Sequence, residues 1–182
     1  MLTPGRIIVL GDSLSVSPTP GEAFPALLQA RLTTRGSAWI VENAGIRGDT
    51  TRGGVNRIDA LLARRPAVLI LALGANDGLR GVDASEISRN LTAIVTRAKA
   101  RQVRVLLCGM ELPPARGFGH ARAFRGVFSA IAREHDVPLV PFLLEGVALN
   151  PEMNGADQIH PNAAGARRIA DTVWEYLEPL AR

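Results

Sequence analysis

The sequence contains a single cysteine, Cys108, and only three histidines among its 182 residues. One cysteine excludes an internal disulfide, and so few His and Cys side chains argue against a structural zinc site. No apolar run approaches the roughly 18 residues that a membrane-spanning helix requires. We therefore expect a fold stabilised by packing alone, with no metal and no membrane span.

Lysine and aromatic residues are also scarce. Lys99 is the sole lysine, and the chain has five Phe, two Trp and one Tyr. The sequence pI of about 10.5 therefore reflects the use of arginine in place of lysine and tyrosine, because 21 basic and 17 acidic residues give a net charge of only +4. The arginines are scattered, and the few aromatics offer no stacking platform for single-stranded nucleic acid. We expect no nucleic-acid partner.

The length and composition fit one globular domain over residues 1–182, with 47% hydrophobic and 21% charged residues. Met1 to Arg6 lacks the basic segment, apolar core and cleavage site of a secretory signal, which predicts a cytoplasmic protein. A chain whose signal had been removed would instead be periplasmic or secreted. The sequence leaves the oligomeric state open and is compatible with a monomer.

Short apolar runs alternate with stretches of helical period along the chain. The runs of strand length cover residues 6–10, 38–42, 67–73, 103–109 and 137–140. This alternation predicts an α/β fold, with a flavodoxin-like five-stranded parallel sheet in the order 2-1-3-4-5 between helices. Asp83 and Glu86 have the spacing of a capping box at the start of one of these helices. Ligands bind such sheets outside the carboxyl ends of the strands, where the strand order reverses.

Four polar blocks follow predicted strands at that edge of the sheet. They cover residues 11–15 (GDSLS), 43–50 (NAGIRGDT), 74–78 (GANDG) and 157–162 (DQIHPN). Acyl transfer from an ester needs a nucleophile, a base that takes its proton, a group that orients the base, and donors aimed at the developing oxyanion. The four blocks contain residue types suited to each of these roles.

Ser13 is the candidate nucleophile, because a tight turn after a strand can present its hydroxyl above the sheet edge. His160 is the candidate general base, since an ordinary imidazole exchanges its proton near neutral pH. Asp157 lies three residues earlier and can hold the second ring nitrogen of His160. His120 and His135 lack such company, and we expect both at the surface.

Each of these residues also has a structural interpretation when it is taken alone. Ser13 could be a turn or N-cap serine, and a bare Asp-x-x-His could be a surface turn beside a helix start at Pro161 and Asn162. The presence of all four blocks together favours catalysis over these alternatives.

Taken together, the blocks resemble those of the GDSL, or SGNH, hydrolases, a name that gives a Ser, a Gly, an Asn and a His from four blocks. The resemblance covers effectively the whole chain, in the family's order. The segments 11–15, 47–50, 74–81, 112–114 and 159–162 look like those of the bacterial arylesterase, lysophospholipase and multifunctional thioesterase branch. This resemblance implies a three-layer α/β/α SGNH hydrolase fold.

The resemblance also implies an oxyanion hole. Its donors would be the backbone N–H of Ser13, the backbone N–H of Gly48 and the side-chain amide of Asn76. Alone, Gly48 could be a turn glycine, and Asn76 could belong to an ordinary turn. We expect Asp12 and Asp49 to accept hydrogen bonds from loop amides rather than to react.

In this branch the acyl chain lies along the loops after the third and fourth strands. The residues implied in substrate binding are Gly78, Leu79, Arg80, Leu112, Pro113 and Phe118, and core packing under those loops is the alternative. Two departures bear on the pocket. Residues 16–20 (VSPTP) stand where relatives often have a Gly-Tyr pair, and Ala115-Arg116 stand where an Asn-Tyr pair is common. The departures indicate a pocket that is wider or differently shaped.

We therefore predict a cofactor-free serine hydrolase that cleaves small acyl or aryl esters through an acyl-Ser13 intermediate, with thioesters and lysophospholipids as further candidates. Its expected partner is a small-molecule ester. A carbohydrate O-acetylesterase on the same fold is the alternative, although few aromatics are available to stack a sugar. A flavodoxin-like binding module is a more remote alternative, since it leaves Asn76, Asp157 and His160 unexplained.

Overall fold

The structure, a computed structural model, describes residues 5–113 and 117–182. The strands of these residues form one parallel sheet in the order β2-β1-β3-β4-β5, as the sequence predicts. They are β1 (Arg6–Gly11), β2 (Ile40–Asn43), β3 (Val68–Ala72), β4 (Arg104–Cys108) and β5 (Leu139–Val140). Strand β3 is buried along its whole length because strands and helices cover it on every side.

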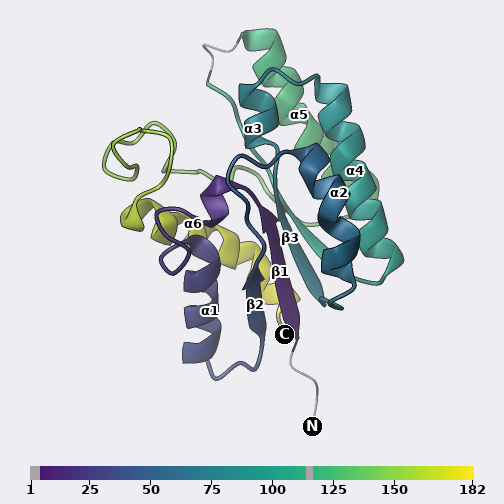
Figure 1. The fold of residues 1–182 in the computed structure, drawn as a ribbon, viewed down its shortest axis with the longest axis vertical. Helices are drawn as coiled ribbons and strands as arrows, with labels where there is room; N and C mark the ends of the chain where they lie inside the picture. The colour runs from purple at the N-terminus through teal and green to yellow at the C-terminus, as the bar shows by residue number, and fades with distance from the viewer. Residues whose placement is uncertain (1–4, 114–116) are drawn as a thin grey trace.

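Helices cover both faces of the sheet. They are α1 (Phe24–Thr34), α2 (Thr51–Leu62), α3 (Ala75–Leu79), α4 (Ala84–Ala100), α5 (Phe118–His135) and α6 (Ala163–Leu177). Helices α1 and α6 pack against each other on one face, and α2, α4 and α5 pack side by side on the other (Figure 1). The chain therefore has the predicted three layers.

Large apolar side chains from both helix layers fill the core. Phe24 of α1 and Phe124 and Phe128 of α5 are fully buried or nearly so. The rings of Phe124 and Phe128 meet edge to face, with centroids 5.3 Å apart. Such an arrangement places the positive ring edge against the negative face and favours one packing.

Helix α3 differs from the prediction, which read residues 74–78 as a loop. The Asn-Asp-Gly sequence is typical of a turn. In the structure, the carboxylate of Asp77 accepts hydrogen bonds from the backbone N–H and hydroxyl of Thr51, at 2.9 and 2.6 Å. Thr51 begins α2, so this buried contact between distant segments favours one helical turn at α3.

The predicted capping box at α4 forms only in part. Asp83 caps the helix by accepting a hydrogen bond from the Ser85 N–H at 2.8 Å. Glu86 instead pairs with Arg52 of α2 at 3.1 Å. A charged partner across the helix layer thus replaces the local contact.

Candidate active site

Ser13 lies directly beyond β1, in a single 3-10 turn, η1 (Ser13–Ser15). Asp12 caps this turn, since its Oδ1 accepts a hydrogen bond from the Leu14 N–H at 2.9 Å. On the other side, the Ser17 hydroxyl donates to the Ser13 carbonyl at 2.7 Å. These two contacts hold Ser13 at the carboxyl edge of the sheet.

The structure brings Ser13, His160 and Asp157 together. His160 Nε2 lies 3.0 Å from Ser13 Oγ, and His160 Nδ1 lies 2.6 Å from Asp157 Oδ2. Ser13 and His160 are 147 positions apart in the sequence, so the fold alone creates this contact. With a proton on Nδ1, Nε2 is free to accept the hydroxyl proton of Ser13.

The loop that carries Asp157 and His160 is closed at its base. An antiparallel bridge joins Asn154 to Pro161, and the Gly155 N–H donates to the His160 carbonyl at 2.8 Å. The buried Asn154 amide donates to the carbonyls of Val147 and Asn150, at 2.7 and 2.8 Å. The loop is thus tied to the segment before it, which fixes the position of the imidazole.

The electrostatics of Asp157 favour an ionised carboxylate. The hydrogen bond to the His160 ring holds the pKa of Asp157 well below its usual range, and the backbone N–H groups of His160 and Ile159 act in the same direction. Asp157 is about half exposed, with 49% of its side chain accessible, and 35% of the His160 side chain is accessible. The Ser-His-Asp chain is therefore open to a substrate from solvent.

The three predicted oxyanion donors lie in η1, in the loop after β2 and in α3, and contacts join these segments. Gly48 has a φ of 75°, in the left-handed region that favours glycine. The Asn76 side-chain amide donates to the carbonyl of Asp49 at 2.9 Å and to Asp12 Oδ2 at 3.3 Å. Through these contacts α3 is joined to the residue after Gly48 and to the residue before Ser13.

Asp12 and Asp49 accept hydrogen bonds from loop amides, as predicted. Asp49 Oδ1 accepts from the Thr50 N–H at 2.9 Å. Asp12 is buried, and its burial raises the pKa of the carboxyl from 3.8 to about 6. The Leu14 N–H and the charge of His160 oppose this rise, while Asp49 and Asp77 add to it.

The residues implied in substrate binding differ in their exposure. Gly78 is buried: a Cβ at this position would lie 2.8 Å from both Leu112 Cδ2 and Phe124 Cε2. Leu79 and Phe118 are exposed to 36% and 82%, and Pro113 is exposed as well.

Arg80 is exposed and donates to the Gly48 carbonyl at 3.2 Å, which places it beside the predicted oxyanion loop. Pro114, Ala115 and Arg116 fall outside the described residues, and so does the departure from the family at 115–116.

The prediction that His120 and His135 are surface residues holds only in part, because both are half-buried. His120 Nε2 lies 3.2 Å from the Gly78 carbonyl, so α5 contacts α3 next to the predicted donor Asn76. His135 Nε2 is buried and has no hydrogen-bond partner among the described residues. Helical spacing alone could not place these rings, since it does not reveal the neighbouring element.

Three further residues that support the site were not found from the sequence. Asn154 anchors the histidine loop, Thr51 joins α2 to α3, and Arg57 of α2 contacts Asp49. The partners of Thr51 and Arg57 lie in other segments, and no short motif reveals them. The contacts of Asn154 are local, and an Asn in a turn-rich segment is a common source of such backbone contacts.

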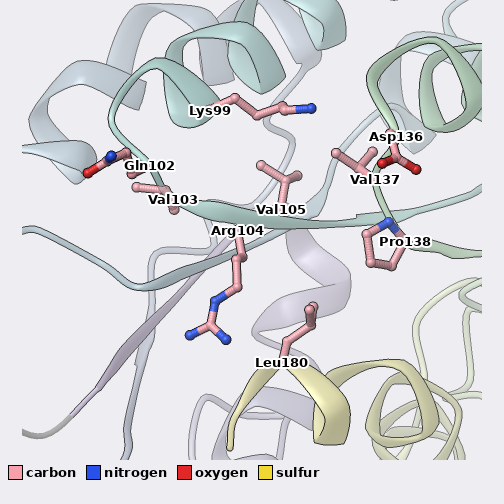
Figure 2. A pocket seen from close by; sticks show the side chains of 9 residues that line it. All are labelled: Lys99, Gln102, Val103, Arg104, Val105, Asp136, Val137, Pro138 and Leu180. Atoms are coloured by element: carbon pink, nitrogen blue, oxygen red, sulfur yellow. The ribbon is translucent and has the colours of Figure 1, made fainter.

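Two hollows lie elsewhere on the molecule. The one in Figure 2 is lined by residues at the end of α4, the start of β4 and the segment before β5, among them Lys99, Arg104 and Pro138. It is therefore at the amino-terminal edge of the sheet, opposite to Ser13. The other lies between α1 and α6 around Trp174.

Within residues 5–113 and 117–182, no group of three or more His, Cys, Asp or Glu side chains is arranged to hold a metal ion. The helices of the same residues include none with the length and apolar character needed to cross a membrane.

The chain is also similar to known proteins. Residues 9–168 match the model of the GDSL-like lipase/acylhydrolase family. The chain is 42% identical over 177 residues to "Esterase TesA" of Pseudomonas aeruginosa, covering 96% of this chain and 88% of the relative. It is 38% identical to "Thioesterase 1/protease 1/lysophospholipase L1" of Escherichia coli, with coverages of 96% and 84%.

Among solved structures, the psychrotrophic esterase EstA from Pseudoalteromonas sp., inhibited by monoethylphosphonate, superposes with a TM-score of 0.91 at 30% identity. The match covers 96% of this chain and 97% of that one.

Proposed function

The chain belongs to the GDSL-like lipase/acylhydrolase family, and on that premise we propose that it hydrolyses small acyl and aryl esters with Ser13 as the nucleophile. It is a carboxylic ester hydrolase. The single observation that supports the role of Ser13 is the continuous contact from its Oγ through His160 to Asp157. A serine hydroxyl gains nucleophilic strength when an oriented base can take its proton.

In the first step, Ser13 Oγ attacks the acyl carbonyl carbon and its proton passes to His160 Nε2. Asp157 stays ionised and keeps the other ring proton on Nδ1, which stabilises the imidazolium that forms. The tetrahedral intermediate then collapses, and the alcohol leaves with the proton from His160. The product is an ester between the acyl group and Ser13.

The oxyanion of the intermediate is stabilised by the N–H groups of Ser13 and Gly48 and by the Asn76 amide. In the structure the Asn76 amide protons contact Asp49 and Asp12, and the contact with Asp12 is the longer one. The proton facing Asp12 is therefore the one available to turn toward a substrate oxygen. A donor of this kind contributes about 100-fold to 1,000-fold in rate.

Deacylation repeats the same proton transfers with water. His160 takes a proton from the attacking water, the hydroxide adds to the acyl carbon, and Ser13 leaves with the proton returned by His160. A thiolate leaves more easily than an alkoxide, so the same residues can serve a thioester. The relatives named as a thioesterase and lysophospholipase favour this wider range of substrates.

The experiment compares wild type with Ser13→Ala on three kinds of substrate: p-nitrophenyl esters of rising chain length, acyl-CoA and lysophospholipid. Wild type should turn over the short aryl esters, and Ser13→Ala should lose activity on every substrate. Full esterase activity in Ser13→Ala would overturn the mechanism. Turnover of acetylated xylan or peptidoglycan, without turnover of aryl esters beyond acetate, would instead identify a carbohydrate O-acetylesterase.

A further inference from the structure

We infer that Arg57 is a positioning residue for the hydrolytic reaction. Its side chain fixes the segments that carry the oxyanion donors. The inference rests on the proposed function, because the donors belong to the proposed reaction. It assigns no contact between Arg57 and the substrate. Arg57 lies in α2, and only 19% of its side chain is accessible.

The guanidinium of Arg57 contacts three residues, which lie at the end of β1 and in the loop between β2 and α2. Its Nε and Nη2 lie 2.8 and 2.7 Å from Asp49 Oδ2, its Nη1 donates to the Ala44 carbonyl at 2.5 Å, and its Nη2 donates to the Gly11 carbonyl at 3.0 Å. Gly11 ends β1, and Ala44 follows β2. One side chain thus joins the carboxyl ends of two neighbouring strands.

Two of these contacts, with Gly11 and with Asp49, lead to predicted oxyanion donors. Gly11 is two residues before Ser13, so its carbonyl fixes the start of the turn that carries the Ser13 N–H. Asp49 follows Gly48 directly, and the carboxylate held by Arg57 therefore limits how the Gly48 peptide can rotate.

The third donor is reached through Asp49 as well. The backbone carbonyl of Asp49 accepts the hydrogen bond from the Asn76 amide at 2.9 Å. Ser13 and Gly48 are therefore within two residues of a residue that Arg57 contacts. Asn76 is hydrogen-bonded to one of these residues, Asp49.

The local sequence provides space for this arrangement. A Cβ on Gly53 would lie only 1.8 Å from Asp49 Oδ1, so glycine at this position lets the carboxylate rest against α2. Only 11% of the Asp49 side chain is accessible. By contrast, Arg97 of α4 pairs with Asp59 of α2, and with 42% and 58% of these side chains accessible, solvent screens the two charges.

The chemistry of the contacts favours arginine. The planar guanidinium has donors pointing in several fixed directions, whereas a lysine ammonium acts as a point charge on a flexible stem. Lysine at position 57 could keep the charge pair with Asp49, but it could not reproduce the fork that reaches both backbone carbonyls. Arg57 therefore acts by fixing the geometry of the donors, and its loss should slow the chemical step.

The test compares Arg57→Gln and Arg57→Lys with two controls. Arg97→Gln removes an arginine of α4 that bonds the Val55 carbonyl and Asp59 of α2, at 3.1 and 3.2 Å. Ile58→Val makes a small cavity beside Arg57 in the core. The assay measures kcat, KM, the folded fraction by circular dichroism, and the rate of labelling by a fluorophosphonate.

We expect Arg57→Gln to lower kcat by about 100-fold, which is the size of effect expected when catalytic groups are misplaced by about 1 Å. KM should change by less than about twofold, and fluorophosphonate labelling should slow in parallel, because its phosphoryl oxygen needs the same donors. Arg57→Lys should fall between Arg57→Gln and wild type. Both controls should keep the wild-type kcat per folded molecule.

A kcat of Arg57→Gln that equals wild type per folded molecule would overturn the inference, as would a change confined to KM. If Arg57→Gln does not fold, Asp49→Asn decides: a lowered kcat with unchanged KM supports the inference, and a wild-type kcat refutes it. A different result would overturn the proposed function, namely labelling of the wild type by the fluorophosphonate at a residue other than Ser13.

Discussion

The buried carboxyl of Asp12 should make the stability of the folded protein depend on pH in an unusual direction. Its pKa rises from 3.8 to about 6 because burial disfavours the charged form. Between these two pH values the folded protein holds a proton that the unfolded chain has released. The contribution of Asp12 to stability is therefore greatest below about pH 4, and it is lost as the pH rises through about 6.

Replacing Asp12 with asparagine removes this ionisation, so the variant should not lose this stability as the pH rises. A pKa rise from 3.8 to about 6 corresponds to about 3 kcal/mol. The difference in unfolding free energy, Asp12→Asn minus wild type, should therefore increase by about 2 kcal/mol between pH 4 and pH 7, since part of the change occurs below pH 4. The amide that this substitution introduces faces the Asn76 amide and adds an unfavourable contact, but this contribution is the same at every pH and cancels in the comparison.

Urea unfolding of both proteins at several pH values measures this change. Asp136→Asn provides the matched control, because Asp136 is exposed and both residue types tolerate its left-handed backbone, with φ at 49°. The control difference should change by less than about 0.5 kcal/mol over the same range. If the Asp12→Asn difference stays constant from pH 4 to pH 7, or decreases, the buried carboxyl does not titrate as described.

Three other results are expected. Asn76→Ala should lower kcat by about 100-fold to 1,000-fold with little change in KM, because one oxyanion donor is lost; steady-state kinetics showing a wild-type kcat would contradict that role. Asp157, whose pKa the His160 ring holds well below its usual range, should stay ionised down to pH 5; a protonated Asp157 carboxyl detected by NMR at pH 5 would contradict its role in orienting His160. Asn154→Ala should lower the unfolding free energy by about 2 kcal/mol, since two carbonyls lose their donor; an unchanged urea midpoint would show that the anchor is dispensable.

The strand order could be predicted from the sequence because its signals are local. The apolar run at residues 67–73 covers β3, and the hydrophobic alternation of strand and helix leaves few parallel topologies. The same logic located the polar blocks, since the carboxyl ends of parallel strands meet at one edge. The contact of Ser13 with His160 depends in addition on the long segment between β5 and α6, because β3 and β4 separate β5 from β1.

Residues whose role depends on a distant partner could not be predicted. Arg57 is 46 positions from Gly11, and an arginine in a helix is most often a solvated surface residue. Helix α3 was missed because its turn-like residues are held in a helix by Thr51 of another element. In both cases tertiary contacts, rather than local propensity, determine the outcome.

The proposed mechanism requires Ser13 to form a covalent ester with the acyl group. Treating the protein with a fluorophosphonate and locating the adduct by mass spectrometry tests this requirement. We predict one adduct per molecule, on Ser13, with loss of esterase activity in proportion to labelling. An adduct on another residue, or full activity with Ser13 labelled, would contradict this claim.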